Sequence, residues 1–258
     1  MIKGLLIGNP VDKSVSHVTH NEIFEKLNIN ATYEKRLISL EKLEEEVADL
    51  KKSDFAFFAV TMPLKEVIVP YLDVDTSGFR CVNTILVKDG KWIGFNFDGI
   101  GCLNAIERVE KVDKKKVLIL GSGGAAKAAI FEAKNRGAEV FIYNRTFERA
   151  QKLAAELGVT ALSEVNSTFD VIIQATSLGM FSDELPLSLK WVGRDTVVME
   201  MVCNPRETYF VKKCIEKGVK VVFGYEMFAE LTFLQLHLAI GSQIDKDLVI
   251  AVVKKFFS

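Results

Sequence analysis

Net charge, long apolar runs and grouped cysteines are all scarce in this 258-residue sequence. Its 33 Lys and Arg residues are balanced by 34 Asp and Glu residues, so it lacks the basic surface that binders of nucleic acids or anionic membranes usually carry. No apolar run approaches the roughly 20 residues of a membrane span, and Gly8 and Pro10 interrupt the first residues before a secretory signal could form. The sequence predicts a cytosolic (cytoplasmic) protein with no nucleic-acid and no membrane partner.

Cysteine usage argues against a metal or disulfide framework. The four cysteines form no CxxC pair, and no histidine stands at metal-ligand spacing from them. Structural zinc sites need such grouped ligands. We expect reduced thiols and no metal.

Hydrophobic residues at 49% and charged residues at 26% are ordinary for a folded chain of one large or two medium domains.

Short apolar runs alternate with amphipathic segments, which predicts an α/β fold with helices covering a mainly parallel sheet. In the first part of the chain, strands are expected over residues 3–8, 31–38 and 55–60, and helices over 16–28 and 40–52. Residues 81–96 read as a hairpin turning at Asp89 and Gly90. A second α/β series follows the charged stretch 110–116, with a strand over 117–120, a helix over 125–137 and a strand over 139–143.

Glycines fill the turn between the first strand and first helix of this second series. A turn of Gly121, Ser122, Gly123, Gly124 and Ala125 directly follows an apolar strand and opens a helix. Without side chains, the backbone can approach a pyrophosphate, whose charge then lies at a helix amino terminus. Because strand, glycine turn, helix and second strand occur together, we predict a Rossmann-type dinucleotide site. The alternative is a turn tightened by glycine that binds no ligand.

The end of the next strand indicates which dinucleotide is bound. An NAD site usually has an acidic residue here for the ribose 2′-hydroxyl. This chain instead has Asn144, Arg145, Thr146 and Arg149, with no carboxylate until Glu148. Arginine presents a planar fork of donors to phosphate oxygens, which favours NADP. The alternative is that these arginines only solvate the start of a helix.

Three polar clusters interrupt the apolar strands of the first half. Ser14 and Ser16 stand at the start of a helix, Thr61 and Lys65 stand at a strand end, Asn83 lies early in the hairpin, and Asp98 follows the hairpin. A lysine directly after a buried strand is a candidate general acid or base, although most lysines are solvated surface residues.

These clusters and the glycine turn resemble, in order, the motifs of the shikimate dehydrogenase family. The matching stretches are SxS...HN (14–21), VTxPxK (60–65), VNT (82–84), NxDGxG (96–101), GSGGAA (121–126), NRTxxRA (144–150), ATSLGM (175–180) and NPRET (204–208). The resemblance implies an oxidoreductase that interconverts 3-dehydroshikimate and shikimate with NADPH in aromatic amino-acid (chorismate) biosynthesis. It also implies two domains, with residues 1–99 binding substrate, completed by C-terminal helices of about 227–258, and residues 100–226 binding NADP.

The resemblance also implies a role for each site residue. Ser14 and Ser16 would bind the substrate carboxylate, and Thr61 and Asn83 the ring hydroxyls. Lys65 and Asp98 would be the catalytic pair, with the lysine exchanging the proton of the C3 oxygen and the carboxylate holding the ammonium and a neighbouring hydroxyl. Further cofactor contacts are implied at Thr176, Val202, Gly224 and Met227, the last two against the nicotinamide.

Several positions depart from the family pattern towards apolar side chains. Phe97, Cys203 and Leu231 replace a threonine, a tyrosine and the late glutamine, and Gln235 follows one helical turn after Leu231. Two alternatives therefore stay open. One is a paralogous quinate or shikimate-type dehydrogenase for a related hydroxylated cyclic acid, and the other is a dinucleotide-binding protein without turnover. A homodimer is compatible with the sequence.

Overall fold

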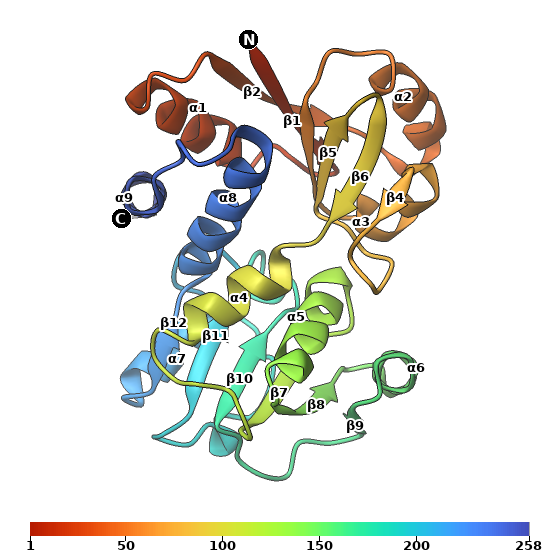
Figure 1. The fold of residues 1–258 in the computed structure, drawn as a ribbon. Helices are drawn as coiled ribbons and strands as arrows, with labels where there is room; N and C mark the ends of the chain where they lie inside the picture. Colours follow the sequence, from red (N-terminus) through yellow and green to blue (C-terminus); the bar gives the residue numbers. More distant parts are fainter. Residues whose placement is uncertain (258) are drawn as a thin grey trace. The chain divides into compact units, whose positions relative to one another are not determined.

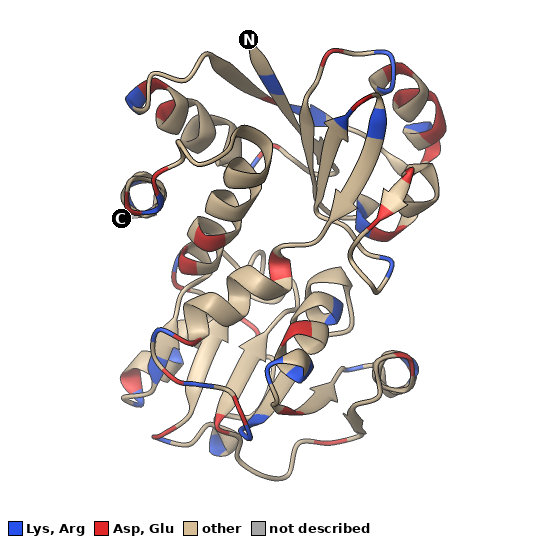
Figure 2. Cartoon of the chain, in the orientation of Figure 1, with Lys and Arg blue, Asp and Glu red and all other residues tan. Residues whose placement is uncertain are grey.

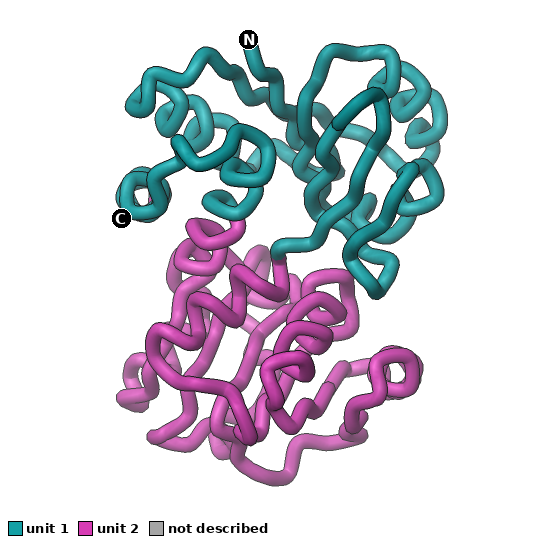
Figure 3. The backbone as a smooth tube through the Cα atoms, viewed as in Figure 1, with its two compact units in different colours: residues 1–97, 232–256, 258 teal, residues 98–231, 257 magenta. Residues whose placement is uncertain are grey.

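Residues 1–257 of the chain, which the computed structural model describes, divide into two units (Figure 3). Unit 1 comprises residues 1–97 and 232–256, and unit 2 comprises residues 98–231 and 257. Each unit contains its own six-stranded sheet. The predicted α/β class is therefore confirmed.

Unit 1 contains a mixed sheet in the order β2-β1-β3-β5-β6-β4. Strands β1, β2 and β3 are parallel, β5 is antiparallel to both β3 and β6, and β4 is parallel to β6. The strands are β1 (Ile2–Gly8), β2 (Ala31–Leu37), β3 (Phe57–Val60), β4 (Val74–Asp75), β5 (Thr84–Lys88) and β6 (Lys91–Phe95). The helices of this unit include α1 (Ser16–Lys26), α2 (Leu43–Leu50), α3 (Leu64–Val67) and α9 (Lys246–Lys255), with short 3-10 turns at Leu40–Lys42 and Val69–Tyr71.

Alternating side chains explain how this sheet is covered. Leu5 and Ile7 of β1 belong to one apolar core with Leu43, Val47 and Leu50 of α2. Helices α1 and α9 lie on the other side of the sheet from α2 (Figure 1). Because successive strand residues point to opposite faces, a strand buried on both sides reads as a continuous apolar run.

The predicted hairpin is confirmed as β5 and β6, which pair antiparallel from Thr84–Phe95 to Lys88–Lys91. Asp89 and Gly90 both have positive φ, at 52° and 72°. A two-residue turn with two positive φ angles matches the twist of the strands it joins, and Asp-Gly is a favoured pair for it. The helix expected over 40–52 is shorter than predicted, because its first residues form a 3-10 turn before α2.

Unit 2 contains a fully parallel sheet in the order β12-β11-β10-β7-β8-β9. Counted within the unit, the order is 3-2-1-4-5-6 read from the β9 edge, which is that of a Rossmann sheet. The strands are β7 (Lys116–Leu120), β8 (Glu139–Tyr143), β9 (Thr160–Leu162), β10 (Val171–Gln174), β11 (Val197–Glu200) and β12 (Lys220–Val222). The helices are α4 (Asp98–Ile106), α5 (Gly124–Asn135), α6 (Phe147–Leu157), α7 (Tyr209–Glu216) and α8 (Gly224–Ile240), with a 3-10 turn at Leu189–Trp191, and the last part of α8 belongs to unit 1.

Apolar side chains cover both faces of the parallel sheet. Val117 and Ile119 of β7 pack in the core that contains residues of α4, α5 and α6, whereas Leu118 and Leu120 pack with Phe210 of α7. Burial on both faces is the reason that this strand is apolar throughout. Basic and acidic residues are interspersed along the helices of both units (Figure 2). Within residues 1–257, no helix is both long and apolar enough to span a bilayer.

Candidate active site

The polar clusters of unit 1 gather at one edge of its sheet. Because β1 and β3 are parallel and β5 runs against β3, the ends of β1 and β3 and the start of β5 share that edge. The serine loop follows β1, Thr61 follows β3, and Asn83 immediately precedes β5. Segments that are distant in sequence therefore bring their polar residues to one place in unit 1.

Backbone hydrogen bonds tie these segments together. Thr61 N–H donates to Ile7 O (2.9 Å), and Asn9 N–H donates to Met62 O (2.9 Å), which joins the loop after β1 to the loop after β3. Val82 N–H donates to Lys65 O (2.8 Å), and Val60 N–H donates to the carbonyl of Asn83 (2.8 Å). Lys65 and Asn83 are thus held on adjoining segments.

The two serines form a compact hydroxyl pair at the start of α1. Their Oγ atoms lie 2.9 Å apart, and Ser16 N–H donates to Ser14 Oγ at 3.3 Å. Ser16 is the first residue of α1 and is buried. Hydroxyl donors at a helix amino terminus, where the helix dipole is positive, suit a carboxylate.

Lys65 lies further from the strand than expected. Thr61 follows β3 directly, but Lys65 is the second residue of the short helix α3, which begins after Pro63. Proline has no N–H to contribute and is tolerated where a helix starts. Both Thr61 and Lys65 are half-buried.

Asp98, the proposed partner of the lysine, opens helix α4 at the beginning of unit 2 and is buried. A carboxylate in the first turn of a helix is stabilised by the helix dipole. Asp98 also affects its own unit, because its charge, together with that of Glu200, adds to the burial that raises the pKa of Cys203 to about 12. Cys203 therefore stays a neutral thiol at physiological pH.

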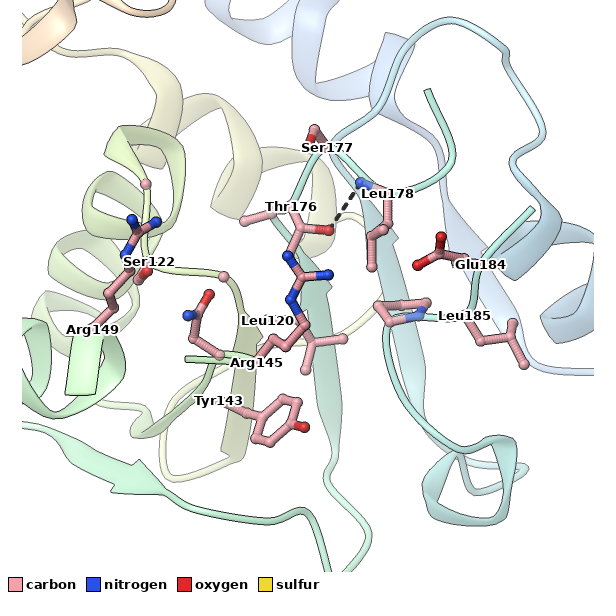
Figure 4. Close-up of a pocket in the computed structure, with 15 residues that line it drawn as sticks. Leu120, Ser122, Tyr143, Arg145, Arg149, Thr176, Ser177, Leu178, Glu184 and Leu185 are labelled. Atoms are coloured by element: carbon pink, nitrogen blue, oxygen red, sulfur yellow. Dashed lines mark hydrogen bonds between the residues drawn. The ribbon is translucent and has the colours of Figure 1, made fainter. Parts of the chain in front are cut away.

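The nucleotide turn of unit 2 opens into a cavity of about 510 Å³ (Figure 4), a size typical of small-molecule sites. Seven of the residues expected to bind the cofactor line it: Gly121, Ser122, Gly123, Asn144, Arg145, Arg149 and Thr176. Gly124 and Ala125 begin α5 behind the turn. Thr146 does not line the cavity, although its carbonyl accepts a hydrogen bond from Nδ2 of the lining residue Asn144 (2.9 Å).

The geometry of the turn explains its glycines. Gly121 has a φ of +113°, and a Cβ there would lie 3.0 Å from Ala175 O. A Cβ on Gly123 would meet nothing within 4 Å, so the backbone faces open space at that point. Gly121 is thus needed for conformation, whereas Gly123 leaves room for a ligand to approach.

Both arginines of the cavity are exposed. Arg145 follows β8, and Arg149 is the third residue of α6 and lies in its first turn. Glu184 and Leu185 lie on the side of the cavity opposite to Arg149 (Figure 4). These two residues were not predicted to be part of the site, because they come from a loop without a motif.

The residues that follow β10 form one wall of the cavity because of the position of this strand in the sheet. Residues 175–178 line the cavity because β10 lies beside β7 at the point where strand order reverses, and ligands bind there in open α/β sheets. Gln174 holds this wall in place. Its Oε1 accepts from Thr176 N–H (3.0 Å) and Thr176 Oγ1 (2.9 Å), and its Nε2 donates to Leu178 O (3.1 Å).

Val202 and Gly224 do not line this cavity, but unit 2 brings them together. A Cβ on Gly224 would collide with the carbonyl of Val202, so only glycine allows this approach. Met227 follows one turn later in α8 and is buried. Leu231 packs against Gly101 of α4, where a Cβ would lie 3.2 Å from Leu231 Cβ.

Glu200 fixes the strand end that carries Val202. Its carboxylate accepts from Val202 N–H (3.0 Å) and from Thr208 Oγ1 (2.8 Å) and is fully buried. Burial raises its pKa from the ordinary 4.5 to about 7, against the opposing effect of these hydrogen bonds.

Replacing Glu200 with glutamine should remove a pH dependence of stability. Because the folded-state pKa lies above the unfolded value, wild-type stability is full below about 4.5 and is lost as the pH rises through about 7. The shift corresponds to about 3 kcal/mol in the free energy of unfolding. Urea unfolding of both proteins across this pH window should show that the free energy of unfolding of the variant, relative to that of the wild type, increases by about 3 kcal/mol as the pH rises. Parallel curves would contradict it.

The parallel sheet, its glycine turn and the cavity beside it define a dinucleotide-binding α/β protein. Residues 6–85 match the family model described as the shikimate dehydrogenase substrate binding domain, and residues 104–181 match that described as shikimate / quinate 5-dehydrogenase. The chain is 38% identical over 240 residues to shikimate dehydrogenase (NADP(+)) of Bacillus cereus strain AH820, covering 86% of this chain and 87% of the relative. The chain belongs to the shikimate dehydrogenase family.

Solved structures give the same relationship. Shikimate 5-dehydrogenase from Thermus thermophilus, in complex with NADP(H) and shikimate, superposes with a TM-score of 0.91 at 29% identity over 99% of both chains. The Aquifex aeolicus shikimate dehydrogenase gives 0.91 at 30% identity over 98% of both chains. Quinate dehydrogenase from Corynebacterium glutamicum, at 21% identity over 98% of this chain and 99% of its own, shares the fold with a TM-score of 0.88.

Proposed function

We propose that this chain is an NADP-dependent shikimate dehydrogenase that interconverts 3-dehydroshikimate and shikimate in aromatic amino-acid biosynthesis, in the cytoplasm. The observation that carries the proposal is the 38% identity to an NADP-dependent shikimate dehydrogenase over most of both chains. The serine pair, Thr61, Lys65 and Asn83 at one sheet edge support it, since these residue types suit a hydroxylated acid.

Substrate recognition is assigned to unit 1. The hydroxyls of Ser14 and Ser16, 2.9 Å apart at the start of α1, would bind the carboxylate. Thr61 and Asn83 would hydrogen-bond the ring hydroxyls. Asn83 and Ser16 are buried, so their bonds to the substrate would form where water competes little.

Proton transfer is assigned to Lys65 and Asp98. When bound, the nicotinamide supplies the hydride that reduces the C3 ketone and accepts it in the reverse direction. Lys65, as an ammonium, would donate a proton to the C3 oxygen during reduction, so that one hydride and one proton convert the ketone to the alcohol. Asp98 would orient the ammonium and a neighbouring hydroxyl. In oxidation the neutral amine of Lys65 would take the proton back.

Cofactor binding is assigned to unit 2. The glycine turn would hold the pyrophosphate at the start of α5, and Arg145 and Arg149 would hold the 2′-phosphate. Thr176, Val202, Gly224 and Met227 would lie along the nicotinamide half. The exposure of both guanidinium groups in the cavity supports the preference for NADP over NAD.

A related hydroxylated acid such as quinate is the second candidate substrate. The specific observation that favours it is that Phe97, Cys203 and Leu231 stand where the family pattern has polar side chains. A leucine cannot hydrogen-bond a ring hydroxyl, and a lost bond of this kind weakens binding by about 0.5 to 1.5 kcal/mol.

A substrate panel tests the proposal. NADP reduction, followed by the absorbance of the reduced nicotinamide, should be fast with shikimate, slower with quinate and absent without acid. Faster turnover on quinate would select the second candidate. Cofactor binding without turnover on either acid would contradict both and favour a dinucleotide-binding protein without turnover. The variant Leu231→Gln restores the glutamine of the family pattern and should lower KM for shikimate.

The oligomeric state is a separate question, and the mass in solution would distinguish a monomer from a homodimer.

A further inference from the structure

A chain of buried hydrogen bonds crosses unit 1 and ends on Asn83. His20 Nε2 lies 3.3 Å from Gln235 Oε1, and Gln235 Nε2 donates to Thr84 Oγ1 (2.9 Å). Thr84 Oγ1 donates in turn to Asn83 Oδ1 (3.0 Å). Each of these four residues is at most 5% exposed. Polar groups buried this deeply need their partners, so the network is strongly constrained.

The direction of every bond follows from one backbone group. Phe97 N–H, which can only donate, contacts Asn83 Oδ1 at 2.9 Å, so this end of the carboxamide must be its oxygen. Thr84 must then donate its single proton to the same oxygen. The Thr84 hydroxyl can now only accept from Gln235, which has to present its amide nitrogen there.

His20 closes the chain at its far end. With the amide nitrogen of Gln235 facing Thr84, its oxygen faces His20, which must donate from Nε2. The ring stacks on Tyr33 with centroids 4.1 Å apart. Its Nδ1 lies 3.3 Å from Thr19 Oγ1, which donates its own proton to Ser16 O at 3.0 Å. Burial lowers the pKa of His20 to about 4, so the ring is neutral at physiological pH.

We propose that Gln235 is a positioning residue of the active site, because its donation to Thr84 commits the Thr84 proton to Asn83 and so supplies the second donor that holds the carboxamide in the orientation required by Phe97 N–H. With two donors on Oδ1, the Nδ2–H groups lie at the other end of the carboxamide, and under the proposed function this is the end that would donate to a substrate oxygen. The inference rests on the proposed function in taking Asn83 as a substrate ligand. Gln235 thus acts on the substrate only through Thr84 and Asn83.

The sharpest variant is Gln235→Glu, which keeps the shape but replaces the donor with an acceptor. The Thr84 proton would turn to the carboxylate and leave Asn83 with one donor fewer. KM for shikimate should rise by about tenfold, the effect of losing roughly one hydrogen bond, with kcat nearly unchanged and KM for NADP unaffected. Thr84→Val should reproduce this effect, and Thr84→Ser, which retains the hydroxyl, should not.

A double-mutant cycle separates positioning from a structural role. In an Asn83→Ala background, Gln235→Glu should cause no further rise in KM, because its effect passes through Asn83. Additive losses would overturn the proposal. If the variants fail to fold, ¹⁵N NMR of the unmodified protein decides, since the relay requires His20 to carry its proton on Nε2. A proton on Nδ1 would overturn it.

Failure of the proposed function gives a different result. The wild type would then bind NADP without oxidising shikimate, whereas the side-chain amide signals of Asn83 would still move in Gln235→Glu. Unmoved signals would overturn the relay whatever the substrate is. The His20 tautomer and the Asn83 signals need no turnover, so the two hypotheses are tested independently.

Discussion

Replacing Lys65 with alanine is expected to reduce kcat for shikimate oxidation by about 10²- to 10⁴-fold, the range typical for removal of a general acid or base. The variant has no group at this position to take the proton from the C3 hydroxyl as hydride leaves. Because the lysine side chain is half-buried on the short helix α3, its loss should disturb folding little. Steady-state kinetics with saturating shikimate and NADP measure the effect.

Two comparisons make this result specific. Lys88→Ala, at an exposed position of β5, should leave kcat unchanged. The affinity of the Lys65 variant for NADP should also be unchanged, since Lys65 is not one of the residues that line the cavity at the nucleotide turn. A kcat within a factor of about two of wild type would exclude Lys65 as the catalytic group.

Removal of both Arg145 and Arg149 is expected to raise KM for NADP by about 100-fold or more, while KM for NAD changes little. Hydrogen bonds to charged groups contribute about 1.5 to 3 kcal/mol each, and only NADP carries the 2′-phosphate that these guanidinium groups would hold. The measurement is the ratio of kcat/KM for the two cofactors in wild type and double variant.

Arg194→Ala is the matched control for this experiment. Arg194 is exposed in the same unit but does not line the cavity, so its loss should leave the cofactor ratio unchanged. An equal loss of affinity for NAD and NADP in the double variant would contradict the assignment. It would show that the arginines serve the dinucleotide in general and not the 2′-phosphate.

Local signals in the sequence were sufficient for much of the fold. The hairpin at Asp89 and Gly90 forms as predicted because two adjacent residues favour positive φ. The glycine turn after β7 also forms as predicted, and Gly121 adopts the conformation that only glycine adopts readily. Boundaries were less accurate, since residues 40–42 form a 3-10 turn where a continuous helix was expected.

Only part of the candidate site was predicted, because only some of its residues belong to a local motif. Glycines and arginines next to strand ends could be recognised because the neighbouring pattern placed them at the nucleotide turn. The cavity wall at Glu184 and Leu185 could not, because these residues come from a loop that carries no periodicity or motif. The mixed topology of the first sheet, which gathers the polar clusters of unit 1, depends on strand pairing that alternation of apolar residues does not specify.

By itself, the sequence determined the α/β class, the hairpin, the nucleotide turn and the residue types available for chemistry. Only the tertiary structure decided which side chains support them. Gln235 bonds to His20 across 215 residues and to Thr84 across 151 residues. Local patterns arise from interactions between near neighbours in the chain, whereas partners this distant meet only when packing of the whole unit brings their elements together.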